Sequence, residues 1–312
     1  MRITALKTTL LLGITWILAA CGPMPTREIH RVAGTNPDWL TNNAYQWARI
    51  KTNAARVRLQ TLYTGQVKVP TAGMLNTDNA KTEMLTHSSL WVDVYAHWIR
   101  HPTKGDFLID TGLDHRFQDT ARGSLKGLIA PWIVEDSRQE PGQDIASQVR
   151  AHNIKLKGVF LSHTHGDHTS GLPALPANTP IYLGPGEPLH QYPAIMYNDH
   201  LDQVKRLYEL DFSQAKTLSP LGKVLDLFGD GSLWAIHTPG HTAGNLSFLV
   251  HTTHGWQLLT GDASHTEWGF KQQVIPGWAE DSDAAEQSLQ GLHEFATANP
   301  EIRVIFGHEG GR

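Results

Sequence analysis

The chain has 312 residues, of which 40% are hydrophobic and 18% are charged. This composition is typical of a globular protein that buries a sizeable core. The 26 Lys and Arg residues stand against 30 Asp and Glu residues, so the formal net charge is −4. Because nucleic-acid binding relies on clustered Lys and Arg, this balance argues against nucleic acid as a partner.

The N-terminus combines basic residues with a short apolar stretch. Residues 10–20 are mostly apolar, and Cys21 follows directly. A membrane-spanning helix needs about 20 apolar residues, so the stretch is read as a secretory signal. Its end, Leu18-Ala19-Ala20-Cys21, resembles the lipobox of bacterial lipoproteins. The resemblance implies a signal peptide over residues 1–20, cleavage before Cys21, and a lipid on Cys21 that anchors the protein to a membrane. An ordinary secretory signal or a buried helix is the alternative.

Lipid attachment implies a location in the bacterial cell envelope, facing the periplasm or the exterior. Gly22 stands where a retained lipoprotein has aspartate, which favours the outer membrane in a Gram-negative host. Cys21 is the single cysteine of the sequence, so the chain forms no internal disulfide. A substrate would then be met outside the cytoplasm.

After the signal, the sequence predicts a tether, a helix and one main domain. Residues 21–55 begin with a proline-containing segment, and Asn36-Pro37-Asp38 then has the form of a helix start. Apolar patterns predict strands over 56–63, 92–98, 107–109, 157–162, 181–183, 233–236, 246–250, 256–260 and 303–306. The second and third of these strands form a hairpin. Helices are predicted over 142–152, around 201–208 and over 282–298. Alternating strands and helices indicate an α/β or α+β domain over residues 56–312.

Potential metal ligands are concentrated in Ser162-His163-Thr164-His165-Gly166-Asp167-His168, directly after a predicted strand. Burying several polar rings without partners costs about a few kcal/mol each, so other groups must satisfy them. Side chains two residues apart share one side of an extended segment, so His163 and His165 can converge on one ion. Gly166 permits a turn that directs Asp167 and His168 toward another.

Three later candidate ligands each follow a predicted strand and stand next to a glycine. They are His241, Asp262 and His308. Strand ends hold side chains on rigid supports, and glycine lets the backbone approach closely. A set of nitrogen and oxygen donors suits Zn²⁺ with open positions, and Fe, Mn or Co accept the same donors. Asp110, also at a strand end, is either a turn residue or a carboxylate that orients a metal-bound imidazole.

These motifs resemble those of the metallo-β-lactamase superfamily. Its HxHxDH signature is matched by His163, His165, Asp167 and His168, and its later motifs by His241, Asp262 and His308. Its early Asp-Thr-Gly turn is matched by residues 110–112. The resemblance covers roughly residues 56–312 and implies an αββα sandwich, with two mixed sheets face to face, helices outside, and the metals at one edge of the sheets.

The resemblance also implies a ligand assignment and a mechanism. One metal would take His163, His165 and His241. The other would take Asp167, His168 and His308, and Asp262 would bridge the two. Two Zn ions are the expected cofactors. Metals that share a water lower its pKa from 15.7 toward about 7, giving a hydroxide that attacks a carbonyl carbon or a phosphorus. Asp167 would hold this nucleophile or carry a proton to the leaving group.

Within the superfamily, the chain most resembles the N-acyl homoserine lactonase group, over residues 94–112 and 259–264. True β-lactamases lack the bridging carboxylate that Asp262 would supply. The lactonases have a tyrosine that contacts the substrate three residues after the bridging aspartate, where this chain has His265. His265 is therefore either a catalytic residue that donates a hydrogen bond to the substrate or a residue of a surface loop.

Three functions agree with these patterns. The first is a dinuclear hydrolase of a lactone or a related ester, acting on a small molecule. The second is a thioester or phosphodiester hydrolase of the same superfamily, since residues 236–242 share the form of the glyoxalase II group. The third is a metal-binding envelope protein without turnover. Pocket walls are expected from residues 64–88 and 184–220, including Tyr192, Met196 and Tyr197. The sequence does not indicate the oligomeric state.

Overall fold

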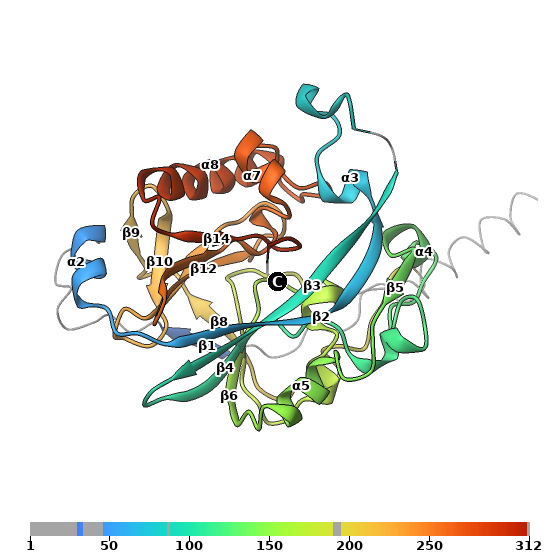
Figure 1. Cartoon of the computed structure of the whole chain (residues 1–312), viewed down its shortest axis with the longest axis horizontal. Helices are drawn as coiled ribbons and strands as arrows, with labels where there is room; N and C mark the ends of the chain where they lie inside the picture. The colour runs from blue at the N-terminus through green and yellow to red at the C-terminus, as the bar shows by residue number, and fades with distance from the viewer. Residues whose placement is uncertain (1–29, 34–45, 86–87, 190–194, 311–312) are drawn as a thin grey trace, which may run out of the picture.

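Two β-sheets lie face to face, with helices on the outer sides, in the computed structural model of the chain (Figure 1). The structure describes residues 30–33, 46–85, 88–189 and 195–310. Helix α8 (Ser282–Ala298) covers one sheet and helix α5 (Ile145–Ala151) lies on the side of the other. The αββα sandwich predicted from the sequence is confirmed.

The first sheet is built from the chain up to residue 211 and has the strand order β1-β8-β7-β6-β4-β3-β2-β5. Its strands are β1 His30–Ala33, β2 Arg58–Pro70, β3 Ser89–His101, β4 Gly105–Ile109, β5 Asp136–Arg138, β6 Leu156–Phe160, β7 Ile181–Leu183 and β8 Leu207–Asp211. Strands β3 and β4 form the predicted hairpin, and β4, β6, β7 and β8 run parallel. Because parallel strands end at the same edge, the residues that follow β4 and β6 meet there.

The second sheet is built from residue 216 onward and has the order β14-β13-β12-β11-β10-β9. Its strands are β9 Lys216–Leu218, β10 Gly222–Asp226, β11 Leu233–His237, β12 Leu246–Thr252, β13 Gly255–Leu259 and β14 Arg303–Ile305. Strands β13 and β14 run parallel, so the residues after them also leave the sheet at one edge. The remaining pairs are antiparallel.

Apolar side chains fill the space between the sheets and under the helices. Phe160 of the first sheet and Phe248 of the second belong to one buried cluster. Helix α8 buries Ala285, Leu289, Leu292 and Phe295 against the second sheet. This spacing of three and four residues produces one apolar face. The side chain of Asp281 accepts a hydrogen bond from the Ala284 N–H at the helix start, so the predicted helix has the predicted bounds.

Shorter helices complete the described chain. They are α2 Trp47–Asn53, α3 Thr71–Met74, α4 Ala130–Ile133, α6 Gly166–Thr169, α7 Glu267–Gln272 and the 3₁₀ turns Ala80–Thr82, His115–Gln118, Leu172–Ala174 and Gly261–Ala263. Among the residues described, we find no helix that is both long and apolar enough to cross a membrane.

The helix predicted around residues 201–208 is wrong. Residues 201–203 form turns, and Leu207–Asp211 is strand β8, which pairs with β7 on one side and with β1 on the other. Leu207 and Leu210 are both buried and stand three residues apart, which imitates helical spacing. Pairing with two neighbouring strands is a tertiary effect that local spacing does not reveal.

Residues 21–55, predicted as a tether and helix, contact both sheets. Strand β1 joins the edge of the first sheet. Helix α2 packs on the second sheet instead: Ile50 is fully buried, and the Trp47 ring lies 4.7 Å from that of Trp256. The Trp47 indole N–H also donates to Asn299 Oδ1 at 2.7 Å. The signal peptide over residues 1–20, Cys21 and the helix start at residues 36–38 lie outside the described residues.

Candidate metal centre

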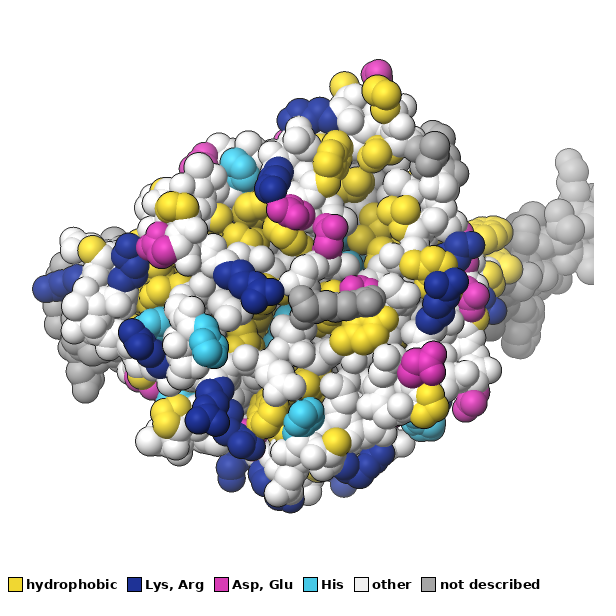
Figure 2. Space-filling view, viewed as in Figure 1, with side chains coloured by type: hydrophobic (Ala, Val, Ile, Leu, Met, Phe, Trp, Pro, Cys, Tyr) yellow, Lys and Arg dark blue, Asp and Glu magenta, His cyan; other side chains and the backbone are white. Residues whose placement is uncertain are grey.

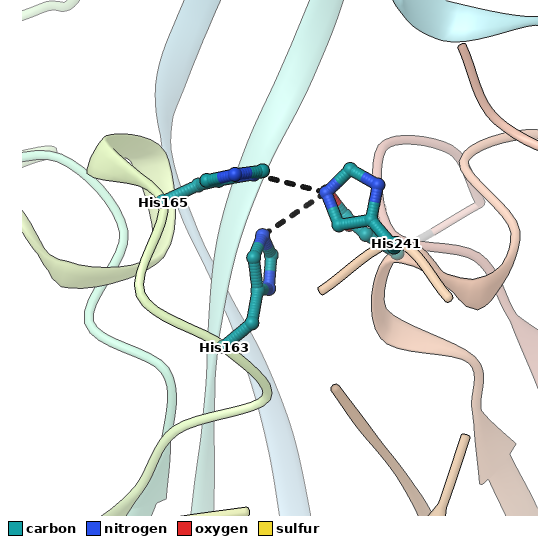
Figure 3. A group of neighbouring side chains, drawn as sticks. His163, His165 and His241 are labelled. Atoms are coloured by element: carbon teal, nitrogen blue, oxygen red, sulfur yellow. Dashed lines mark hydrogen bonds and ion pairs between the residues drawn. The ribbon is translucent and has the colours of Figure 1, made fainter. Parts of the chain in front are cut away.

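The seven predicted ligands converge where loops of the two sheets meet. One group contains His163, His165, His241 and Asp262, and a second contains Asp167, His168 and His308; within each group the potential ligand atoms lie within 4.8 Å of one another. Figure 3 shows His163 and His165 pointing toward His241, which comes from the opposite side. The structure thus brings together residues from three loops of the second sheet and one loop of the first.

The loop after β6 turns in the way that the sequence predicted. His165 stands at the start of the short helix α6, and its carbonyl accepts hydrogen bonds from the N–H groups of His168 and Thr169. This turn at Gly166 separates the side chains of His163 and His165 from those of Asp167 and His168. One extended segment can therefore supply ligands to two neighbouring ions.

Asp110 orients this loop. Its backbone has a φ of 56°, in the left-handed region that few residues other than glycine adopt. The carboxylate accepts hydrogen bonds from the Ser162 N–H at 2.7 Å and from the Ser162 hydroxyl at 2.8 Å. It also lies 2.8 Å from His168 Nδ1. Of the two roles open for Asp110, the structure favours the carboxylate that orients a ligand imidazole.

The Asp262 carboxylate lies between the two groups. Its Oδ2 is 3.6 Å from His163 Nε2, 3.4 Å from His241 Nε2 and 3.5 Å from His308 Nε2. Its Oδ1 is 3.4 Å from His168 Nε2. The glycine before His308 is required here, because a Cβ on Gly307 would lie 2.5 Å from Asp262 Oδ1. This position suits a carboxylate that bridges two metals.

Several of these polar atoms are buried without a hydrogen-bond partner, among them the Nε2 atoms of His163 and His168 and Oδ1 of Asp262. An unsatisfied buried polar group costs about 1–3 kcal/mol. Nitrogen lone pairs and carboxylate oxygens that face one point are the donors that Zn²⁺ and related cations bind. The residues present therefore fit metal ions.

Electrostatics favour the metal-binding forms of His163, His241 and Asp262, whereas the Asp262 and Asp167 carboxylates outweigh burial and raise the pKa of His168 and His308. Burial, aided by the neighbouring imidazoles, lowers the pKa of His163 and of His241 well below the ordinary value. Burial would raise the pKa of Asp262, but the surrounding imidazoles, His168 first, hold it well below its usual range. Neutral imidazoles and an ionised carboxylate are the forms that bind metals.

Glu187 joins the two ligand loops, although nothing in the sequence pattern singles it out. Its carboxylate accepts hydrogen bonds from the Thr164 N–H and hydroxyl at 2.7 and 2.8 Å. It also accepts from the Thr242 hydroxyl at 2.7 Å and the Gly244 N–H at 3.2 Å. Burial raises the pKa of this carboxyl, while the donors from Thr242 and Thr164 oppose the shift. The loop of His163 and His165 is thereby tied to the loop of His241.

His265 faces the centre, so the expectation of a surface loop residue is wrong. Its side chain is 5% exposed, and Nε2 lies 3.1 Å from Asp262 Oδ2. Its Nδ1 is 3.0 Å from the carbonyl oxygen of Met74 in α3. Met74 belongs to residues 64–88, so this segment reaches the site through one hydrogen bond, and pocket walls from it stay a prediction.

Hydrophobic side chains are exposed on the face seen in Figure 2. The segments 126–129 and 195–197 are joined by backbone hydrogen bonds and expose Leu128, Ile195 and Met196. The second segment continues to His200, whose Nδ1 lies 2.8 Å from the Thr169 hydroxyl in α6. Met196 and Tyr197 as pocket walls remain a prediction, and Tyr192 lies outside the described residues.

Comparisons with known proteins agree with this architecture. A family model described as metallo-beta-lactamase superfamily matches residues 90–308. The N-acyl homoserine lactonase of a Bacillus species is 30% identical over 215 residues, which cover 66% of this chain and 77% of the relative. The gamma-lactamase FDB1 of Fusarium pseudograminearum is 32% identical over 193 residues, 55% of this chain. The matches span 45% and 56% of the two fungal gamma-lactamases FDB1 and MBL2, about half of their length.

Solved structures show the same fold. An N-acyl homoserine lactone hydrolase, with N-hexanoyl-L-homoserine bound at its catalytic metal center, superimposes with a TM-score of 0.64. The two chains are 22% identical, and the alignment covers 81% of this chain and 94% of the other.

Proposed function

Because the chain belongs to the metallo-beta-lactamase superfamily, we propose that it is a metal-dependent hydrolase that opens a lactone or a related ester of a small molecule. The observation that carries the proposal is the position of Asp262 between two groups of buried ligands. Relatives named N-acyl homoserine lactonases support the substrate class. The superfamily's dinuclear arrangement would place two Zn ions here, with Fe, Mn or Co as alternatives.

The ligand assignment follows the two groups. His163, His165 and His241 would hold one ion, Asp167, His168 and His308 the other, and Asp262 both. The ions would polarise the ester carbonyl and supply a water of lowered pKa as nucleophile. Asp110 holds the His168 ring in place through Nδ1. Glu187 fixes the distance between the loops of His163 and His241.

Asp167 is the carboxylate that we assign to proton transfer. Its side chain is 24% exposed, whereas that of Asp262 is 4% exposed. Its Oδ2 lies 3.4 Å from His308 Nε2 and 3.6 Å from His168 Nε2, so it belongs to the second group and still reaches solvent. Opening a lactone leaves an alkoxide that needs a proton, and Asp167 would take the proton released by the attacking water and pass it to that oxygen.

Thioesters and phosphodiesters remain alternative substrates. The segment 236–242, which resembles the glyoxalase II group, supplies His241 to the proposed centre, and its His237 Nε2–H donates to the Ala243 carbonyl at 3.1 Å within the same loop. This contact gives no preference for a thioester. We therefore rank lactones and related esters first.

Zn-loaded protein lacking residues 1–21 would test the proposal against N-hexanoyl homoserine lactone, an acyl thioester and a phosphodiester. We expect lactone opening, measured by proton release, and loss of both turnover and bound metal in His163→Ala and Asp262→Ala. Hydrolysis of another substrate alone would reassign the bond type. Metal binding without turnover of any substrate would favour a binding function.

We also propose that residues 1–20 are removed and that Cys21 carries the lipid that anchors the protein in the envelope. The proposal rests on the sequence at residues 18–21. Radiolabelled palmitate incorporated by the wild type and not by Cys21→Ser would support it. An unlabelled wild type in the soluble periplasmic fraction would refute it.

A further inference from the structure

We propose that His265 is itself a metal ligand, which binds through Nε2 beside His308 and Asp262 and adds an eighth protein ligand to the centre. This inference rests on the metal centre of the proposed function, but not on its substrate. Ligand atoms of Asp262, His265 and His308 lie within 4.8 Å of one another, as in the two predicted groups.

His265 Nε2 is placed to donate its lone pair to a metal. It is buried without a hydrogen-bond partner. Its distance to Asp262 Oδ2, 3.1 Å, is shorter than the 3.4 Å of His241 Nε2 and the 3.5 Å of His308 Nε2 to the same oxygen. A buried nitrogen this close to a carboxylate needs a cation beside both atoms, either a proton or a metal.

The other ring nitrogen fixes the tautomer that a neutral His265 ring adopts. Because the Met74 carbonyl can only accept, His265 Nδ1 carries the proton that forms the 3.0 Å hydrogen bond. In the neutral ring, Nε2 then has a free lone pair. His308 is held in the same way, with Nδ1 2.8 Å from the Asp93 carbonyl. Metal-binding histidines commonly donate their second N–H to such an acceptor.

This tautomer disagrees with the donor role considered for His265. A neutral imidazole whose proton is on Nδ1 has no hydrogen to offer from Nε2. The His265 ring therefore cannot replace the phenolic O–H that contacts the substrate in the lactonases that this chain resembles. The substitution of tyrosine by histidine therefore exchanges a substrate contact for a metal contact.

The backbone places His265 and His308 as a pair. The His308 N–H donates to the His265 carbonyl at 3.0 Å, and the Gly307 N–H donates to the Ser264 carbonyl at 3.1 Å. The rings lie with centroids 5.1 Å apart. Both side chains therefore extend from adjacent, hydrogen-bonded segments toward one point.

The additional ligand changes the metal preference. With Asp167, His168, His308 and Asp262, His265 brings the second site to five protein ligands. Structural Zn²⁺ prefers four ligands in a tetrahedron, whereas Fe and Mn accept higher coordination numbers with nitrogen and oxygen donors. We expect the second site to bind Mn²⁺ or Fe²⁺ better than a four-ligand site does.

The test measures metal and not turnover. In the full chain, His265→Asn keeps a donor for the Met74 carbonyl but removes Nε2, and His265→Ala removes both. His97→Asn is the control, because His97 is buried nearby and contacts the Thr61 hydroxyl through Nδ1. We expect both His265 variants to bind one metal normally and the second at least about tenfold more weakly, with a changed absorption spectrum of the Co²⁺ form.

Circular dichroism of each variant verifies folding. Normal affinity for both metals in a folded His265→Asn protein, with an unchanged Co²⁺ spectrum, would overturn the inference. Equal metal loss in the His97 control would overturn it as well, because the loss would then reflect packing. A protein that loses its second metal in the His265 variants but never hydrolyses a lactone would support this inference and refute the substrate proposal.

Discussion

Replacing Glu187 by glutamine is expected to weaken the centre from a distance. The carboxylate contacts no ligand side chain, but it accepts four hydrogen bonds from the loops that carry His163, His165 and His241. In Glu187→Gln, one oxygen still accepts from Thr164. The new NH₂ group faces the Thr242 hydroxyl, which can rotate and accept, and the Gly244 N–H, which cannot.

The expected loss of folding stability follows from the number of hydrogen bonds that the substitution removes. One buried N–H loses its acceptor, which costs about 1–3 kcal/mol of folding stability. The two loops then separate slightly, and changes of this kind behind metal ligands reduce metal affinity by about 10–100-fold. The reduction should fall on the site of His163, His165 and His241, because both tied loops supply that site.

Competition with a chromophoric chelator measures the two metal affinities, and urea unfolding of the metal-free protein measures stability. Glu280→Gln is the matched control, since Glu280 is exposed and accepts from Ala243 in the same loop as His241. Wild-type metal affinity and stability in Glu187→Gln would refute the reasoning. Equal losses in the control would show that the loop tolerates no change at either position.

Three further predictions can be measured on the same protein. At a free metal concentration of a thousand times the Kd, each bound metal should stabilise the fold by about 4 kcal/mol, and a chelator should remove this contribution. An unchanged melting temperature after chelation would contradict a buried metal centre. Burial lowers the pKa of His200 from 6.5 to about 3. Below pH 6.5 the unfolded chain therefore binds a proton at His200 that the folded chain does not bind, and the free energy of unfolding decreases as the pH falls. His200→Asn should therefore lose about 2 kcal/mol less than wild type between pH 7 and pH 5 in urea unfolding, and parallel pH curves would contradict the shift. Gly184→Ala should destabilise by more than about 2 kcal/mol, because its Cβ would lie 1.8 Å from the Gly244 carbonyl oxygen. An unchanged free energy of unfolding in Gly184→Ala would contradict this close approach of the two backbones.

The sequence predicts which side chains come together at the centre, because each of them follows a strand and stands near a glycine, and these are local patterns. It does not predict Glu187, because a single glutamate in a loop has no local signature and its four donors come from distant segments. The same limit explains strand β8, whose two buried leucines imitate helical spacing. Whether His265 is buried depends on α3, which lies 191 residues earlier in the chain.

The division of the chain at residues 212–215 has a consequence for assembly. All strands of one sheet precede this point and all strands of the other follow it. Each half of the polypeptide therefore contains a complete sheet but only part of the proposed ligand set. Helix α2 belongs to the first half and packs on the second, as a latch between them. If the chain were cut within this connection, the two pieces would have to recombine before either metal found its ligands. Free metal concentration would then control how tightly the fragments associate, as a small-molecule dimeriser does.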